Sequence, residues 1–121
     1  MKTCLVVDDS RFVRKVARQI LEELQFTVVE AGDGRQALEQ CSQALPDCIL
    51  LDWVMPVMDG LEFMKEMRKL PGSDEVKVVF CSSRNELRQI ETVLNEGSDE
   101  YIMKPFDREM IESKFSLLGL L

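Results

Sequence analysis

Short runs of apolar residues alternate along the chain with longer stretches in which apolar residues recur every three or four positions. Runs of the first kind are typical of buried strands, and the second spacing is typical of amphipathic helices. Strands are predicted at Cys4–Val7, Thr27–Glu30, Cys48–Leu51, Val76–Cys81 and Glu100–Met103. A helix is predicted after each strand, at Phe12–Leu24, Arg35–Leu45, Leu61–Leu70, Asn85–Asn95 and Arg108–Leu118. The chain is therefore expected to contain five consecutive strand–helix units.

Alternation of strands with helices of this length predicts a parallel sheet covered on both faces, with right-handed crossovers. The expected fold class is α/β, a doubly wound five-stranded parallel sheet with five helices. Three pairs of residues have the spacing of helix-capping pairs and support the predicted boundaries: Asp33 with Gln36, Asp59 with Glu62, and Ser83 with Glu86. In the first helix, the apolar stripe predicted to face the core begins at Phe12.

The composition limits what the chain can be. Its 121 residues, 45% of them hydrophobic, suit one domain covering residues 1–121. A net charge of -7, without a block of basic residues, argues against nucleic acid as a partner. The longest apolar runs have only about four residues, so we expect neither a signal peptide nor a membrane span. The expected location is the cytoplasm.

Cysteine and histidine usage excludes two further kinds of site. The cysteines, Cys4, Cys41, Cys48 and Cys81, are scattered, and three of them lie within apolar runs, so we expect buried, reduced thiols. A redox switch would need an exposed thiol beside a cation, and nothing in the sequence indicates one. The chain has no histidine, which excludes a histidine-based zinc site or general base.

Three carboxylates stand where predicted strands end. Asp8 and Asp9 follow the first strand and Asp52 follows the third. Parallel strands share one carboxyl edge, and with strand order 2-1-3-4-5 these acids would line the crevice between strands 1 and 3, where ligands bind. Crowded carboxylates need a compensating cation, and Mg²⁺ prefers such oxygen ligands. The alternative is that Asp8 and Asp9 only cap the first helix.

A hydroxyl and an ammonium group are expected at the same edge. Ser82 follows the fourth strand and Lys104 follows the fifth. A carboxylate nucleophile beside a divalent metal, a hydroxyl and a lysine is an arrangement suited to in-line phosphoryl transfer.

These residues lie in motifs that resemble the CheY-type receiver domains of two-component response regulators. The motifs are Val6–Ser10, Leu51–Gly60 and Met103–Phe106, and the resemblance covers essentially the whole chain. The resemblance implies a flavodoxin- or CheY-like fold and a single-domain response regulator rather than an enzyme. Its implied partners are a sensor histidine kinase or histidine phosphotransferase and a downstream protein target, without nucleic acid or membrane. Output would pass through phosphorylation-dependent protein contacts or a phosphorelay.

The same resemblance implies a role for each site residue. Asp52 would be the phosphoacceptor. Asp9 and Asp52 would bind Mg²⁺ directly, Asp8 largely through water, and Val54 through its backbone carbonyl. Ser82 and Lys104 would bind the phosphoryl oxygens. The resemblance further implies a cis peptide bond between Lys104 and Pro105, and a conformational switch formed by Ser82 and Tyr101.

Two departures from the family pattern concern the lifetime of the phosphorylated state. Val54 has no polar side chain two residues beyond the nucleophile, and Arg84 stands two residues beyond the hydroxyl. Neither side chain suits the orientation of an attacking water, so we expect slower hydrolysis than in fast chemotaxis-type receivers.

Two other protein classes fit the sequence less well. A Mg²⁺-dependent aspartyl-nucleophile phosphatase also uses a carboxylate at a strand end, but it needs a second acid at the position of Val54. A flavodoxin-like electron carrier would bind a cofactor phosphate at the first loop, where Asp8 and Asp9 would repel it.

Overall fold

The chain forms one parallel sheet with strand order β2-β1-β3-β4-β5 in a computed structural model that describes residues 1–83 and 87–121. The strands are β1 (Thr3–Val7), β2 (Thr27–Ala31), β3 (Cys48–Asp52), β4 (Lys77–Ser82) and β5 (Glu100–Met103). The helices are α1 (Arg11–Glu23), α2 (Gly34–Gln43), α3 (Gly60–Met67), α4 (Leu87–Asn95) and α5 (Arg108–Leu117), with a short 3-10 helix, η1 (Ser73–Glu75). The predicted fold class and strand order are confirmed.

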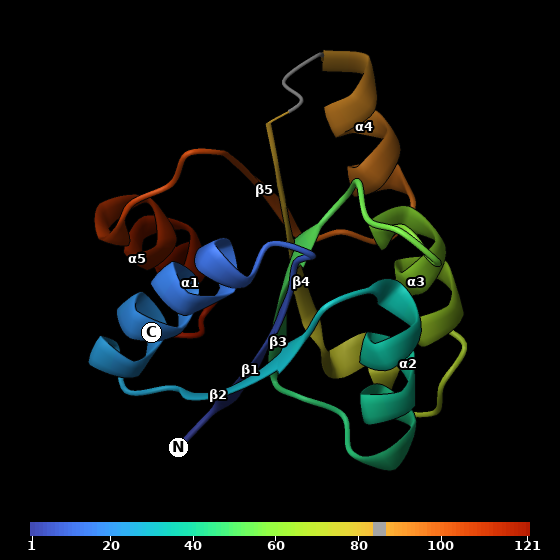
Figure 1. The fold of residues 1–121 in the computed structure, drawn as a ribbon, viewed down its shortest axis with the longest axis horizontal. Coiled ribbons are helices and arrows are strands. Elements are labelled where there is room, and N and C mark those ends of the chain that lie inside the picture. The colour runs from blue at the N-terminus through green and yellow to red at the C-terminus, as the bar shows by residue number, and fades with distance from the viewer. Residues whose placement is uncertain (84–86) are drawn as a thin grey trace.

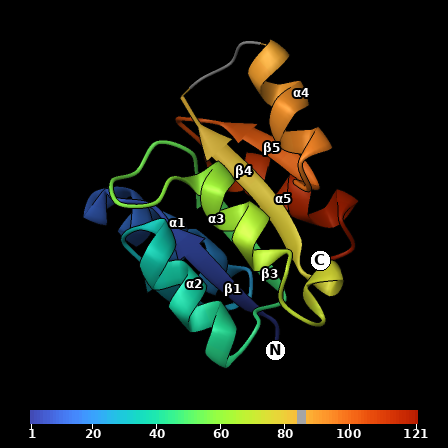
Figure 2. The same ribbon diagram turned by 90° about the vertical axis from the view of Figure 1, so that its right-hand side faces the viewer.

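Helices cover both faces of the sheet. Figure 1 shows α1 and α5 on one side and α2, α3 and α4 on the other, and Figure 2 shows α2 and α3 in front of the sheet. Each strand therefore contributes to two cores. In β1, Leu5 and Val7 belong to the core beneath α2 and α3, whereas Cys4 and Val6 belong to the core beneath α1 and α5. Burial on both faces explains why the strands are continuous apolar runs in the sequence.

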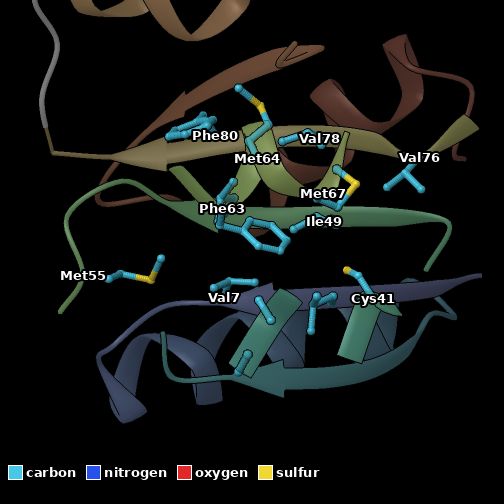
Figure 3. Packing of buried hydrophobic residues seen from close by; sticks show 14 of the residues in the cluster. Val7, Cys41, Ile49, Met55, Phe63, Met64, Met67, Val76, Val78 and Phe80 are labelled. Carbon is cyan, nitrogen blue, oxygen red and sulfur yellow. The ribbon is translucent and has the colours of Figure 1, made fainter. Parts of the chain in front are cut away.

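The core on the α3 side is built largely from α3 itself. Phe63, Met64 and Met67 are fully buried and pack in one cluster with Ile49 of β3 and Phe80 of β4 (Figure 3). These contacts fix α3 against the two central strands. They also fix the loop between β3 and α3, which follows Asp52.

The helix caps show which polar side chains begin the helices. Asp33 and Asp59 accept hydrogen bonds from the backbone N–H groups of Gln36 and Glu62, as predicted. Ser10 caps α1, because its Oγ accepts from the N–H of Val13. The alternative that Asp8 or Asp9 caps this helix is therefore wrong, and both acids are left for another role. The pair predicted at Ser83 and Glu86 lies partly outside the described residues.

Several boundaries differ from the prediction. Phe12 is 74% exposed rather than part of the buried stripe, because it lies in the first turn of α1, where it lines an open apolar hollow with Pro105 and Phe106. The segment between the predicted helix Leu61–Leu70 and the predicted strand Val76–Cys81 contains η1, which ends at Glu75, and β4 begins at Lys77. Helix α2 ends at Gln43 because Ala44 adopts an extended conformation.

All four cysteines are buried free thiols, as predicted. Burial raises the pKa of the Cys41 thiol to about 11, which keeps it protonated and unreactive near neutral pH. Among the helices within residues 1–83 and 87–121, none has the length and apolar character needed to span a bilayer.

Candidate functional site

Three carboxylates converge at the carboxyl edge of the sheet. Val7 pairs with Leu51 in the β1–β3 register, which brings Asp8 and Asp9 beside Asp52. One oxygen from each carboxylate lies within 4.8 Å of the other two. Asp8 and Asp52 are only 3% and 7% exposed, whereas Asp9 is exposed to solvent. The convergence expected from the strand order is present.

Asp8 is held by three hydrogen bonds from three different residues. Its Oδ1 accepts from the backbone N–H of Ser10 at 2.9 Å, and its Oδ2 accepts from Nζ of Lys104 at 2.6 Å. Its backbone carbonyl accepts from Nη1 of Arg14 at 2.6 Å. The position of this carboxylate is thus defined by both its backbone and its side chain.

Lys104 brings a positive charge to the acids from the end of β5. Its Nζ lies 2.6 Å from Oδ2 of Asp8 and 3.2 Å from Oδ1 of Asp52. Burial opposes the charged form of Lys104, but the hydrogen bond and charge of Asp8 and the charge of Asp52 outweigh it, so the pKa of Lys104 is raised. Lys104 is therefore a fixed cation. The peptide bond between Lys104 and Pro105 is cis, as the resemblance implied.

The surroundings of Asp52 disfavour the ionised form of its carboxyl group. Burial, together with the charge of Asp8, raises the pKa of Asp52 to about 6. The charge and hydrogen bond of Lys104 and the N–H of Trp53, which donates to Oδ1 at 3.0 Å, oppose this shift. At neutral pH the group is mainly ionised, so the site holds a negative charge that is incompletely compensated.

A glycine allows the backbone of Asp52 to be packed closely. The N–H of Gly60 donates to the carbonyl of Trp53 at 2.8 Å. A Cβ atom on Gly60 would overlap the carbonyl oxygen of Asp52. The start of α3 thus rests directly on the backbone of the candidate nucleophile, and only glycine fits there.

The other predicted site residues occupy distinct places. Ser82 is buried at the end of β4, and its carbonyl accepts from the N–H of Lys104 at 2.9 Å, which joins the ends of β4 and β5. Cys81 pairs with Asp52 in the β3–β4 register, so Ser82 lies one residue beyond the position opposite Asp52. Val54 is 54% exposed. Tyr101 is buried in the core with α3 and α4, and Arg84 lies outside the described residues.

The donor set suits a hard divalent cation. The candidate ligands are carboxylate oxygens, which Mg²⁺ prefers, and partial exposure of the site leaves room for the waters that Mg²⁺ usually keeps. Lys104 supplies one positive charge against three carboxylates. An additional cation would relieve the remaining repulsion, so the site fits Mg²⁺ in both ligand chemistry and charge.

The pattern of the sequence did not reveal Arg14 and Glu30, which border the site. Arg14 Nε donates to Oε1 of Glu30 at 3.1 Å while Nη1 of Arg14 reaches the Asp8 carbonyl. The sequence offered one signal, which is that the charged residue Glu30 ends the predicted strand Thr27–Glu30. It did not identify the partner, because that depends on how α1 crosses the sheet.

Comparison with known proteins agrees with this geometry. The response regulator receiver domain family model matches residues 4–116. The chemotaxis protein CheY of Halobacterium salinarum is 33% identical over 115 residues, which cover 95% of this chain and 94% of that protein. The structure of chemotaxis protein CheY4 of Vibrio cholerae has a TM-score of 0.90 at 29% identity, covering 100% of this chain and 99% of that chain. A chain of the CheX–CheY–BeF3–Mg²⁺ complex of Borrelia burgdorferi has a TM-score of 0.88 at 26% identity, covering 97% and 89%.

The chain belongs to the response regulator receiver domain family. Receiver domains are signalling modules of two-component systems, and the predicted CheY-like family and fold are confirmed.

Proposed function

We propose that Asp52 is the phosphoacceptor of this receiver domain. The observation that carries the proposal is the position of its carboxylate, which is nearly buried at the end of a central strand, beside two other acids and 3.2 Å from an ammonium group. An isolated buried acid would be neutral, but this one is placed where cations can hold it ionised.

The reaction is transfer of a phosphoryl group to a carboxylate oxygen of Asp52. A phosphorus–oxygen bond forms as the bond between phosphorus and the donor atom breaks, and for a phosphohistidine donor the imidazole nitrogen leaves and takes up a proton. Asp9, Asp52 and the Val54 carbonyl would hold Mg²⁺ directly, and Asp8 would do so through water. When bound, Mg²⁺ neutralises charge on the reacting oxygens.

Lys104 and Ser82 would then bind the transferred phosphoryl group. Lys104 already lies between Asp8 and Asp52, so its ammonium group can stabilise the negative charge that develops on the phosphoryl oxygens during transfer. Ser82 stands one residue beyond the nucleophile on the neighbouring strand, so its hydroxyl is suited to donate to a second oxygen.

The donor would be a sensor histidine kinase or a histidine phosphotransferase. Output would pass to a downstream protein, either through a changed binding surface or by onward transfer of the phosphoryl group. The change would begin when Ser82 moves towards the phosphoryl group and Tyr101 changes its packing. Both residues are nearly buried, at 2% and 7% exposure, so movement of one alters the space available to the other side chains of the core.

Labelling with a small phosphodonor tests the assignment. Wild type incubated with Mg²⁺ and acetyl phosphate should gain one phosphoryl group by intact mass spectrometry, and Asp52→Asn should gain none. Asp59→Asn is the matched control, because asparagine caps a helix as well as aspartate and the residue lies in the same loop. Persistent labelling of Asp52→Asn would refute the assignment.

The proposed metal ligands make a separate prediction. Asp9→Ala should weaken Mg²⁺ binding more than Asp8→Ala, since a direct ligand contributes more than one that acts through water. Equal losses in the two variants would contradict these roles.

A phosphatase would behave differently from a phosphoacceptor. It needs an acid to protonate the leaving group, and Val54 supplies none. The protein should therefore release no phosphate from a chromogenic phosphate ester beyond the background of Asp52→Asn. Turnover that disappears in Asp52→Asn would favour the phosphatase.

A further inference from the structure

Arg14 links two elements that flank the acidic cluster. From α1, its Nη1 donates to the backbone carbonyl of Asp8 at 2.6 Å and its Nε donates to Oε1 of Glu30 at 3.1 Å. The side chain is 17% exposed, so these are partly desolvated, charge-assisted hydrogen bonds rather than a surface ion pair. Arg14 therefore connects the β1–α1 loop to β2.

Glu30 is itself a firm attachment point. Its Oε2 accepts from Nε of Arg18 at 2.6 Å, and its backbone carbonyl accepts from Nε2 of Gln40 in α2 at 2.7 Å. Burial acts to raise the pKa of Glu30, but the hydrogen bonds and charges of Arg18 and Arg14 outweigh burial and lower it. Glu30 thus stays ionised near neutral pH and neutralises the charge of Arg14.

The loop that Arg14 grips holds two of the three acids. Asp8 and Asp9 are adjacent, and repulsion between their carboxylates and that of Asp52 would act to separate this loop from β3. The hydrogen bonds described for Arg14 go to a carbonyl and to Glu30, not to the clustered carboxylates. Arg14 can therefore hold the loop in place while the carboxylate oxygens stay available to a metal ion.

We propose that Arg14 is a positioning residue for the cation site, which keeps the oxygens of Asp8, Asp9 and Asp52 converged by fixing the Asp8 carbonyl against β2. The inference rests on the proposed function, since the cation is the Mg²⁺ invoked there. Arg14 acts through Asp8 and is not a catalytic residue.

Arg18 provides a matched control. It is four residues along the same helix and hydrogen-bonds the other oxygen of Glu30, but its described bonds go to Glu30 and Glu22 rather than to the loop. Loss of Arg14 removes the link to Asp8, whereas loss of Arg18 removes the bonds to Glu30 and Glu22 and leaves the link between Arg14 and Asp8. If Arg14 acts specifically on the cation site, the two alanine variants will therefore differ in their affinity for Mg²⁺.

Mg²⁺ alone is the probe, followed through the fluorescence of Trp53, and Mn²⁺ measured by electron paramagnetic resonance gives a readout independent of the tryptophan. Arg14→Ala should weaken binding about tenfold or more, as is usual when a group that orients a metal ligand is removed. Arg18→Ala should bind as wild type does. Arg14→Lys should be intermediate, because one ammonium group cannot satisfy both the carbonyl and Glu30.

Urea unfolding in the presence of a chelator separates positioning from general stabilisation. If Arg14 and Arg18 merely stabilise the fold, both alanine variants will lose stability while the folded protein keeps its full affinity for the ion. Wild-type affinity in Arg14→Ala, or in Arg14→Lys should the alanine variant fail to fold, would overturn the inference. If wild type itself neither binds Mg²⁺ nor accepts a phosphoryl group, the proposed function fails, and the inference fails with it.

Discussion

Lys104 lies closer to Asp8 than to Asp52, with its Nζ 2.6 Å from the first carboxylate and 3.2 Å from the second. The ammonium group thus sits between the two nearly buried acids of the cluster. It neutralises part of the charge that would otherwise attract a metal ion. Lys104 and a bound Mg²⁺ would consequently oppose each other electrostatically in the resting site, although under the proposed function both would favour the phosphorylated state.

Removal of Lys104 should therefore separate metal binding from phosphorylation. Lys104→Met should bind Mg²⁺ more tightly than wild type, because the cluster loses its internal cation, yet accept a phosphoryl group from acetyl phosphate more slowly. Titration of Trp53 fluorescence and intact mass spectrometry measure the two effects. Lys114→Met is the control, because Lys114 of α5 forms an ion pair with Glu100 of β5 rather than with the acids of the site. Weaker Mg²⁺ binding by Lys104→Met would contradict the electrostatic opposition between Lys104 and Mg²⁺.

The raised pKa of Asp52 predicts the pH dependence of stability in the metal-free protein. The pKa is about 6 in the fold against an ordinary value of 3.8, so between these values the folded state binds more protons than the unfolded state. Stability should fall as pH rises through this window, and the loss is complete above about pH 6. Since one pKa unit corresponds to about 1.4 kcal/mol, the loss is roughly 2–3 kcal/mol. Urea unfolding in a chelator at several pH values measures it.

The Asp52→Asn variant tests whether Asp52 causes this loss. Without an ionisable group at this position, the variant should be more stable than metal-free wild type at pH 7.5, and its stability should vary less between pH 4 and 7. Added Mg²⁺ should stabilise wild type more than the variant. Parallel pH curves for the two proteins would assign the dependence to other groups.

Gly60→Ala should damage the site through the backbone. The added methyl group would overlap the carbonyl oxygen of Asp52, so either α3 or the backbone of Asp52 must shift. Overpacking of this kind costs about 1–3 kcal/mol. Thermal or urea unfolding should show that loss, and the folded variant should phosphorylate more slowly. Gly32→Ala is a suitable control, because a Cβ there would come no closer than 3.6 Å to its nearest neighbour, Nη1 of Arg14.

Val54 should prolong the phosphorylated state. Its side chain is 54% exposed beside the site and cannot accept a hydrogen bond from an attacking water. Val54→Asn should therefore lose its phosphoryl group faster than wild type at saturating Mg²⁺, with each lowering of the barrier by about 1.4 kcal/mol giving a tenfold faster rate. Arg84→Glu and the double variant complete the comparison. Unchanged or slower decay in all three would show that neither side chain controls access of water.

The fold and the core of the site were predictable because their signals are local. The run Cys4–Val7 ends at Asp8, and the run Cys48–Leu51 ends at Asp52, so the rule that parallel strands share one carboxyl edge was enough to bring the acids together. Lys104 could be placed for the same reason. The sequence could not predict that Nζ of Lys104 lies closer to Asp8 than to Asp52, because this depends on the conformation of a long side chain.

The features that the sequence did not reveal depend on tertiary contacts. Phe12 continues the helical spacing of α1, but spacing alone does not show that the first turn lies beside an open hollow. Arg14 resembles any exposed helical arginine until α1 is laid against Glu30 and the Asp8 carbonyl. Helix η1 has only three residues, too few to produce a periodic pattern.

The contact between Asp8 and Lys104 joins residues 96 positions apart and affects the order in which the molecule can be completed. During synthesis the acids leave the ribosome well before the lysine. A growing chain that has formed β1 and β3 would hold the crowded carboxylates without Lys104, their counterion. Early assembly of the carboxyl edge of the sheet is therefore opposed by charge repulsion. A polypeptide that has been elongated past Lys104 can balance that charge with its own ammonium group, so the site forms after β5 has been synthesised.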